Sequence, residues 1–250
     1  MSVLDIRGLS KSFGSLVAVN DVSLAVEAGV FQAIIGPNGA GKTTVFNLIS
    51  GLFRPTSGSI VFNGEDVTAL VPDKRVARGM ARTFQITEIC PELTVGMNLC
   101  IGVEVAGGFR LRPWLSRAET AVNVARVDEL AGMVGLASKI DRLVGELSHG
   151  DQRAVEIGMA LALRPKLLLL DEPTAGMGDQ ETEVIAELMQ RLHKTHGMTI
   201  VLIEHDMELV FRLADRIAVL DRGAVLAMGT PAEIAANDAV QAAYLGRQEA

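Results

Sequence analysis

The chain has 250 residues, 49% of them apolar and only 4% aromatic, so aliphatic side chains must fill a core large enough for one domain or a core with a satellite lobe. Its formal net charge of −7 argues against the basic field of a nucleic-acid-binding domain. The amino terminus, MSVLDIRGLS, has no signal-peptide pattern, and no stretch approaches the ~20 apolar residues of a membrane-spanning helix.

The first quarter of the chain alternates short apolar runs with turn residues, a pattern typical of strands. Asn63-Gly64 fits the tight turn of a hairpin. A further apolar run, VFQAII, leads directly into a Gly-rich loop, and TTVFNLISGL after that loop has helical spacing. The predicted strands are residues 3–9, 16–26, 30–35 and 59–67, and the predicted helix is 43–52.

The middle of the chain is predicted to be mostly helical. Residues 73–83 form a basic, helix-like stretch, and helical patterns dominate residues 87–163 with an interruption at 107–120. The two cysteines, Cys90 and Cys100, lack the spacing of a metal or redox pair, which indicates free thiols in a reducing compartment.

The last third of the chain alternates buried strands with helices. KLLLLDE and MTIVLIEHD are apolar runs that end in polar residues, and a charged amphipathic helix separates them. DRIAVLDRG is read as a strand and turn, followed by a short helix after Pro231. This alternation predicts an α/β fold with a parallel sheet, whose sites lie at the carboxyl ends of the strands.

The nonapeptide GPNGAGKTT carries the strongest chemical signal. It matches the phosphate-binding pattern G-x-x-x-x-G-K-[ST], follows a strand and opens a helix. Backbone N–H groups of such a loop cradle phosphate oxygens, while Lys42 reaches the β- and γ-phosphates and Thr43 ligates Mg²⁺. A chance Gly-rich turn is the alternative. The loop, called the phosphate loop below, consists of Gly36, Pro37, Asn38, Gly39, Ala40, Gly41, Lys42, Thr43 and Thr44.

Two acids follow the apolar strand KLLLL. Asp171 is placed to hold the shell of the Mg²⁺ ion, and Glu172 is placed to orient and deprotonate an attacking water. A helix cap or a solvated turn is the alternative for this pair. His205 ends the strand TIVLIE, where it could hydrogen-bond a γ-phosphate, or be an ordinary core histidine.

Six motifs in order make the chain resemble the nucleotide-binding subunit of an ATP-binding cassette (ABC) transporter over nearly its whole length. They are KSFG, GPNGAGKTT, RTFQ, LSHGDQR, LLLLDEP and IEHD. The resemblance implies that Phe13 stacks on adenine, that Gln85 senses Mg²⁺ and water, and that His205 is the switch histidine. It also implies a nucleotide-binding core with an N-terminal antiparallel β subdomain (1–86 and 164–250) and a helical signature subdomain (87–163).

The motif LSHGDQR, called the signature turn below, occupies residues 147–153. By the resemblance, Ser148 and Gly150 face the γ-phosphate held by the phosphate loop of a second nucleotide-binding chain, so that two half-sites close around ATP. An ordinary helix capping box, Ser148 to Asp151, is the alternative. Asp151 replaces the glutamine usual in the family, and we expect it to reach back to the Ser148 N–H.

Details such as ARTFQ, DEPTAGM and IEHDMELV resemble one branch of the family, the ATPase subunits of branched-chain amino acid importers and their amide and urea relatives. The resemblance implies ATP and Mg²⁺ as cofactors, a peripheral location on the cytoplasmic face of the inner membrane, and three kinds of partner. These are a second ATPase chain, identical or related, integral membrane permease subunits, and a solute-binding protein; nucleic acid is not expected.

The segment after Gln85 is predicted to contact a permease through apolar side chains such as Ile89 and Leu93, or else to be an internal helix. A non-transport ABC ATPase is the competing function. Such proteins usually carry two cassettes or a long insert and a basic face, whereas this chain has one cassette and a negative net charge. A P-loop kinase would leave the signature turn unexplained.

Overall fold

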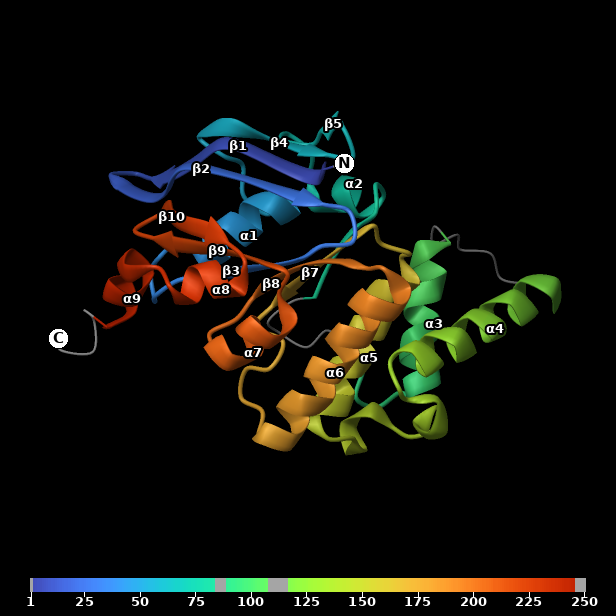
Figure 1. The fold of residues 1–250 in the computed structure, drawn as a ribbon. Helices are drawn as coiled ribbons and strands as arrows, with labels where there is room; N and C mark the ends of the chain where they lie inside the picture. Colours follow the sequence, from blue (N-terminus) through green and yellow to red (C-terminus); the bar gives the residue numbers. More distant parts are fainter. Residues whose placement is uncertain (1, 84–88, 108–116, 246–250) are drawn as a thin grey trace.

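The computed structural model describes residues 2–83, 89–107 and 117–245. Two sheets form its framework (Figure 1). One is antiparallel, with the order β2-β1-β4-β5, and the other has the order β10-β9-β3-β8-β7-β6 and is parallel from β9 to β6. The predicted α/β class, with a parallel sheet and an N-terminal antiparallel sheet, is confirmed. The strands are β1 (Ser2–Phe13), β2 (Leu16–Glu27), β3 (Phe31–Ile35), β4 (Ser57–Phe62), β5 (Glu65–Asp66), β6 (Met80–Arg82), β7 (Leu167–Asp171), β8 (Thr199–Ile203), β9 (Arg216–Asp221) and β10 (Ala224–Gly229).

The central strands are continuous apolar runs because both faces of the parallel sheet are covered. In β3, Phe31, Ala33 and Ile35 pack into the core on one face, while Ile34 packs into the core on the other. Helix α1 (Lys42–Ser50) lies between the two sheets and fills the second of these cores (Figure 1). The first residues of α1 therefore meet the carboxyl ends of the parallel strands.

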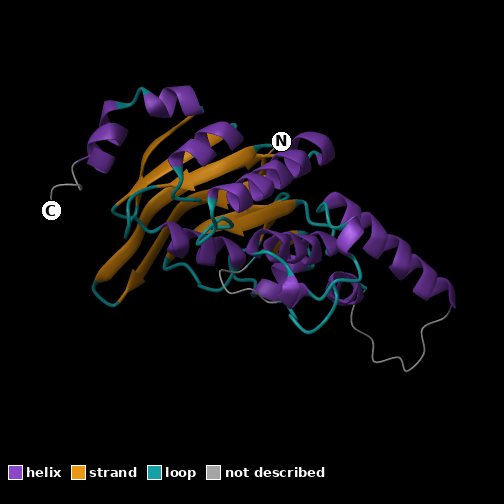
Figure 2. Ribbon diagram, turned by 90° about the horizontal axis from the view of Figure 1, so that it is seen from below, coloured by secondary structure: helices purple, strands orange, loops and turns teal. Residues whose placement is uncertain are grey.

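The opposite face of the parallel sheet is covered by helices (Figure 2). Two of them, α6 (Asp179–His196) and α7 (Met207–Leu213), follow β7 and β8 in the chain. Three others form the helical lobe, which consists of α3 (Val95–Ala106), α4 (Arg117–Met133) and α5 (His149–Ala162). This lobe shares a core with the sheet and lies at the end of the molecule remote from the C-terminal helix α9 (Asp238–Leu245). The subdomain boundaries near residues 87 and 163 stay predictions.

The basic stretch 73–83 is not one helix, which corrects the sequence prediction. Helix α2 covers only Pro72–Val76, and β6 begins four residues later at Met80. Gly79, at φ 99°, ends the helical turn, and its carbonyl accepts the N–H of Leu167. Buried Met80 and Ala81 then pair with β7 as an edge strand. Local charge patterning could not show this long-range pairing.

The C-terminal part contains more elements than the sequence indicated. The predicted helix after Pro231 is confirmed as α8 (Pro231–Ala235), with a capping box at Thr230. Helix α7, strand β10 and helix α9 were missed.

Three further predictions concern other parts of the chain. The Asn63-Gly64 hairpin turn is confirmed, with φ angles of 49° and 81°. Cys90 and Cys100 are free thiols. In the part of the chain that the structure describes, no helix has the length and apolar character to cross a bilayer.

Candidate functional site

The phosphate loop connects β3 to α1 and forms one wall of a cleft of about 530 Å³. Residues 38–44 line the cleft together with Glu172 and His205. The structure thus brings together the ends of three strands, β3, β7 and β8, and the end of β3 precedes the other two by more than a hundred residues in the chain. The sequence prediction of a shared site for these residues agrees with this arrangement.

Glycine is required at two positions of the loop by close approach of other backbone. A Cβ on Gly36, at φ 152°, would lie 2.2 Å from the Leu220 carbonyl oxygen. A Cβ on Gly41, at φ 97°, would lie 2.5 Å from the Ala18 carbonyl oxygen. Backbone atoms of strands β2 and β9 contact the phosphate loop at these two glycines, so the curved conformation of the loop is fixed before any ligand binds.

Lys42 is buried in the loop. Its ammonium group donates to the carbonyl oxygens of Gly36, at 2.7 Å, and Pro37, at 3.1 Å. Burial lowers the pKa of Lys42, and the nearby charges of Glu172 and Asp171 oppose that shift. A lysine held by two neutral carbonyls inside a low-dielectric loop offers a strong site for a phosphate oxygen.

Glu172 and His205 form a pair on the far wall of the cleft. His205 Nε2 lies 2.7 Å from Glu172 Oε1. Glu172 adopts φ 46°, a left-handed conformation unusual for a non-glycine residue, and its N–H donates to the Ile203 carbonyl. Strained backbone conformations of this kind are common at active sites, where they fix the position of a side chain. The pair lies just beyond the carboxyl ends of the adjacent strands β7 and β8.

Asp171, at the end of β7, is fully buried beneath the cleft. Its Oδ2 accepts from Arg82 Nη2 at 2.7 Å, whereas its Oδ1 has no hydrogen-bond partner among the described residues. Burial raises the pKa of Asp171, and the Arg82 guanidinium opposes that shift. An orphaned buried carboxylate oxygen fits a ligand of a hard cation such as Mg²⁺. Thr43, the other predicted ligand in the described chain, is exposed at the cleft.

Two residues that were not predicted from the sequence hydrogen-bond to the segments that carry Glu172 and His205. Glu204, buried at the end of β8, accepts from both the N–H and the hydroxyl of Thr174, and from the N–H of His205. Arg153 in α5 donates to the carbonyl oxygens of Pro173, at 3.1 Å, and Glu172, at 3.2 Å. Glu204 belongs to the motif IEHD and Arg153 to LSHGDQR. The sequence does not indicate which residues these two side chains contact.

The signature turn opens α5, with Ser148 as its N-cap. The Ser148 hydroxyl accepts the Asp151 N–H at 3.2 Å, so the capping alternative is confirmed for Ser148. The expectation that Asp151 reaches back to Ser148 is wrong, because its carboxylate pairs with Lys139 at 2.5 Å. Ser148 is exposed, and Gly150 is buried against Glu181 of α6. Of the described residues, those that line the cleft include neither Ser148 nor Gly150.

Phe13 ends β1 at an exposed hairpin next to the cleft. Its side chain is 45% exposed, and its ring packs edge-to-face on Phe53 at a centroid distance of 5.4 Å. Leu16 and Val17, which follow it in the hairpin, are exposed and line the cleft. An apolar surface beside a phosphate loop suits a nucleobase, and the stacking role of Phe13 stays a prediction. Gln85 lies outside the described residues.

The described side chains do not form a complete metal-binding site by themselves. Across residues 2–83, 89–107 and 117–245, no cluster of three or more His, Cys, Asp or Glu side chains could hold a metal ion. A cation held through Thr43, Asp171 and the phosphates of a nucleotide needs no such cluster.

Comparison with known proteins gives a consistent result. Residues 19–175 match the family described as ABC transporter, and residues 224–250 match the family described as branched-chain amino acid ATP-binding cassette transporter. The chain is 40% identical over 253 residues, 98% of each protein, to the high-affinity branched-chain amino acid transport ATP-binding protein BraF of Pseudomonas aeruginosa.

Two solved structures extend this comparison. The ADP conformation of MJ1267, an ATP-binding cassette of an ABC transporter, superposes with a TM-score of 0.87 at 32% identity, covering 99% of this chain and 100% of that one. A dimeric post-hydrolysis state of the ATP-binding cassette MJ0796, bound to ADP and Pi, superposes with a TM-score of 0.74 at 28% identity, covering 91% and 98%.

Proposed function

The chain belongs to the ABC transporter family of ATPases, and from this premise we propose that it is the ATP-hydrolysing subunit of an importer for branched-chain amino acids or closely related amides. The observation that carries the hydrolytic part is the Glu172–His205 pair at 2.7 Å, which lines the same cleft as the phosphate loop. The solute class is supported by the match of residues 224–250 and by the named function of BraF.

In this proposal each residue of the cleft has a role. The loop N–H groups and Lys42 bind the β- and γ-phosphates of ATP. Thr43 and Asp171, together with Gln85, would hold Mg²⁺, which when bound neutralises charge on the phosphates. Glu172 accepts a proton from the attacking water, and His205 holds the Glu172 carboxylate toward that water. Phe13 and the hairpin beside it contact the adenine ring.

A second chain completes each site. Because Ser148 does not line its own cleft, the exposed amino end of α5 is available to a nucleotide held by another molecule. Two chains arranged head to tail would close around two ATP molecules and separate after hydrolysis. The dimeric structure of MJ0796 supports this arrangement.

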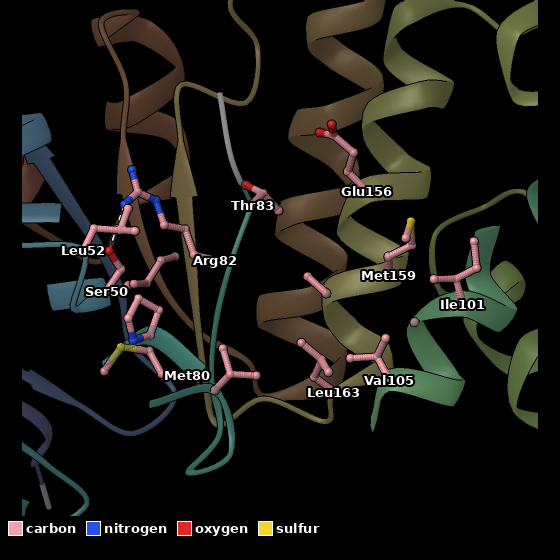
Figure 3. Close-up of a pocket in the computed structure, with 15 residues that line it drawn as sticks. Ser50, Leu52, Met80, Arg82, Thr83, Ile101, Val105, Glu156, Met159 and Leu163 are labelled. Atoms are coloured by element: carbon pink, nitrogen blue, oxygen red, sulfur yellow. Dashed lines mark hydrogen bonds between the residues drawn. The ribbon is translucent and has the colours of Figure 1, made fainter. Parts of the chain in front are cut away.

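The permease subunits would dock on an apolar groove between the parallel sheet and the helical lobe. This groove, called the interlobe groove below, encloses about 260 Å³ (Figure 3). Leu52 on one side and Ile101 and Val105 on the other are exposed. Ile101 and Val105 lie one turn apart on α3, so they present a continuous stripe to a partner helix.

The groove modifies the predicted permease contact. Ile89 is partly buried against the core, and Asn98 accepts the N–H of Cys90. Residues 89–94 are therefore folded onto α3 without being helical, whereas residues 95–99 form the start of α3. The groove adds exposed apolar side chains to this surface. A peripheral position on the cytoplasmic face of the membrane, and a solute-binding protein in the assembled importer, follow from this proposal.

The variant Glu172→Gln tests the hydrolytic mechanism. The amide keeps the shape of the side chain but cannot accept a proton, so we expect ATP binding to persist while phosphate release falls by about 100-fold or more. A dimer should accumulate with ATP and be seen by light scattering. Glu187→Gln, the same change at an exposed position of α6, should behave as wild type. Undiminished hydrolysis by Glu172→Gln would contradict the assignment.

The solute class needs a separate measurement. In vesicles containing the assembled permease and this chain, we expect the solute-binding protein loaded with leucine to stimulate ATP hydrolysis. Stimulation by a loaded sulfate-binding protein and not by the leucine-loaded one would overturn the amino-acid assignment while leaving the ATPase intact.

A further inference from the structure

Arg82 joins three elements around the buried carboxylate of Asp171. Its Nη2 donates to Asp171 Oδ2 at 2.7 Å, and its Nη1 donates to Asn47 Oδ1 at 2.7 Å and Ser50 Oγ at 2.8 Å. The guanidinium also lies over the ring of Phe46 at 5.5 Å. One rigid fork in β6 therefore fixes the distance between the end of β7 and α1, the helix whose first turn carries Lys42 and Thr43.

This fork also decides how the Asp171 carboxylate is oriented. Arg82 occupies Oδ2, and Oδ1 has no hydrogen-bond partner among the described residues. The carboxylate thus keeps one oxygen for a cation. Arg82 also places a positive charge 2.7 Å from the buried Asp171 carboxylate. Groups that orient a metal ligand in this way commonly set the metal affinity.

Arg82 also lines the interlobe groove. In Figure 3, Arg82, Ser50 and Leu52 lie on one side and Glu156, Met159 and Val105 on the other. The opposite wall of the groove, which contains Glu156, is also connected to residues 171–173. Glu156 pairs with Arg153 at 2.5 Å, and Arg153 donates to the carbonyl oxygens of Glu172 and Pro173. Both walls of the groove therefore contact residues 171–173 through a buried arginine.

We propose that Arg82 is a positioning residue that sets the affinity of Asp171 for the metal ion, and that it makes this affinity depend on what fills the interlobe groove. The second part rests on the proposed function, because the occupant is taken to be a permease helix. A helix that packs on the Arg82 stem, Ser50 and Leu52 would shift the guanidinium. Such a shift changes the geometry of its hydrogen bonds to Asn47, Ser50 and Asp171 together, because one planar group makes them all.

Metal titration of the isolated chain tests the first part. Mn²⁺ replaces Mg²⁺, a non-hydrolysable ATP analogue fills the cleft, and free Mn²⁺ is measured by electron paramagnetic resonance. We expect Arg82→Met to weaken Mn²⁺ binding about 10- to 100-fold, and Arg82→Lys to weaken it less because a charge remains. Binding of the analogue without metal should fall by less than the binding of Mn²⁺. Arg78→Met, which removes an exposed ion pair with Glu65, is the matched control.

Two outcomes overturn this role for Arg82. One is wild-type Mn²⁺ affinity in a folded Arg82→Met protein. If that variant does not fold, Asn47→Ala removes one anchor of the guanidinium and leaves its pair with Asp171 intact. We then expect a weakening of about two- to tenfold, below the full loss of an orienting group; unchanged affinity in Asn47→Ala would overturn the role.

The same titration in the assembled complex tests the second part. Assembly with the permease should change the Mn²⁺ affinity of the wild-type chain by about fivefold or more, and that of Arg82→Lys by less. Assembly that leaves the wild-type affinity unaltered overturns the link to the groove. Failure of the chain to assemble with a permease overturns the proposed function instead, and the titration of the isolated chain still decides the role of Arg82.

Discussion

The Lys139 ammonium lies 2.5 Å from the Asp151 carboxylate, so the acid in the signature turn is paired within its own chain. Lys139 comes from a short 3-10 helix, Ala137–Lys139, that precedes the turn. The pairing explains how an acidic residue is accommodated beside a surface proposed to meet a phosphate. The Asp151 carboxylate is bound to Lys139, which compensates its charge.

We expect Lys139→Met to weaken ATP-driven dimerisation, because Asp151 would then present an unpaired negative charge to the γ-phosphate of the second chain. In a Glu172→Gln background, the ATP concentration for half-maximal dimer formation should rise about two- to fivefold, as for the loss of a partly exposed ion pair. The double variant Lys139→Met/Asp151→Asn should return to the starting value. A double variant as weak as Lys139→Met would contradict the charge explanation.

Phe13→Ala should weaken ATP binding about tenfold, since stacking of a base on an aromatic ring contributes roughly 1–3 kcal/mol. Phe13→Tyr, which keeps the ring, should restore the affinity. Fluorescence titration with a labelled ATP measures both variants, and inorganic triphosphate is the control ligand because it has no base. Equal losses for ATP and triphosphate would place the effect of Phe13 in the phosphate site rather than at the base.

Arg75→Met should destabilise the fold by about 3 kcal/mol or more, because several buried carbonyls lose their donor. The Arg75 side chain is fully buried and donates to the carbonyl oxygens of Leu48 and Ile49 at the end of α1, and to those of Leu70 and Thr68. Urea unfolding measures the change. Arg75→Lys should not restore stability, because one ammonium cannot span these carbonyls.

Arg78→Met serves as the control for this loss, because Arg78 lies three residues away and its hydrogen bonds, to Glu65 and to the Lys74 carbonyl, are at the surface. Its free energy of unfolding should match that of wild type. Equal destabilisation by Arg75→Met and Arg78→Met would show that positive charge in this stretch, rather than the buried hydrogen bonds, carries the stability.

Asp215 should make the free energy of unfolding depend on pH in the acidic range. Burial acts to raise its pKa, but hydrogen bonds from the Phe31 N–H and from Lys194, with His193 nearby, outweigh burial and lower the pKa below 3.8. A lowered pKa in the folded state stabilises the chain above pH 3.8, and this contribution is lost as pH falls through the folded value. The stability difference between wild type and Asp215→Asn should shrink as the pH falls below about 4. A constant difference down to pH 3 would contradict this role.

The sequence determined the parts of this protein that depend on local pattern. The loop from Gly36 to Thr44, the buried run before Asp171 and the turn at Asn63-Gly64 each carry their own chemistry, and the structure places them where the pattern predicted. The α/β class followed from the alternation of strands and helices, because the fold rules for parallel sheets are general. Six ordered motifs were sufficient to indicate the family.

Only the tertiary structure decided which distant side chains meet. Arg82 was read as part of a basic helix, yet it belongs to an edge strand and contacts Asp171, 89 positions later. Asp151 was assigned to its own helix cap and pairs instead with Lys139. These partners are chosen by packing between elements, since a buried charge must find its counter-charge wherever the fold brings one near, and the spacing of residues along the chain does not encode that meeting.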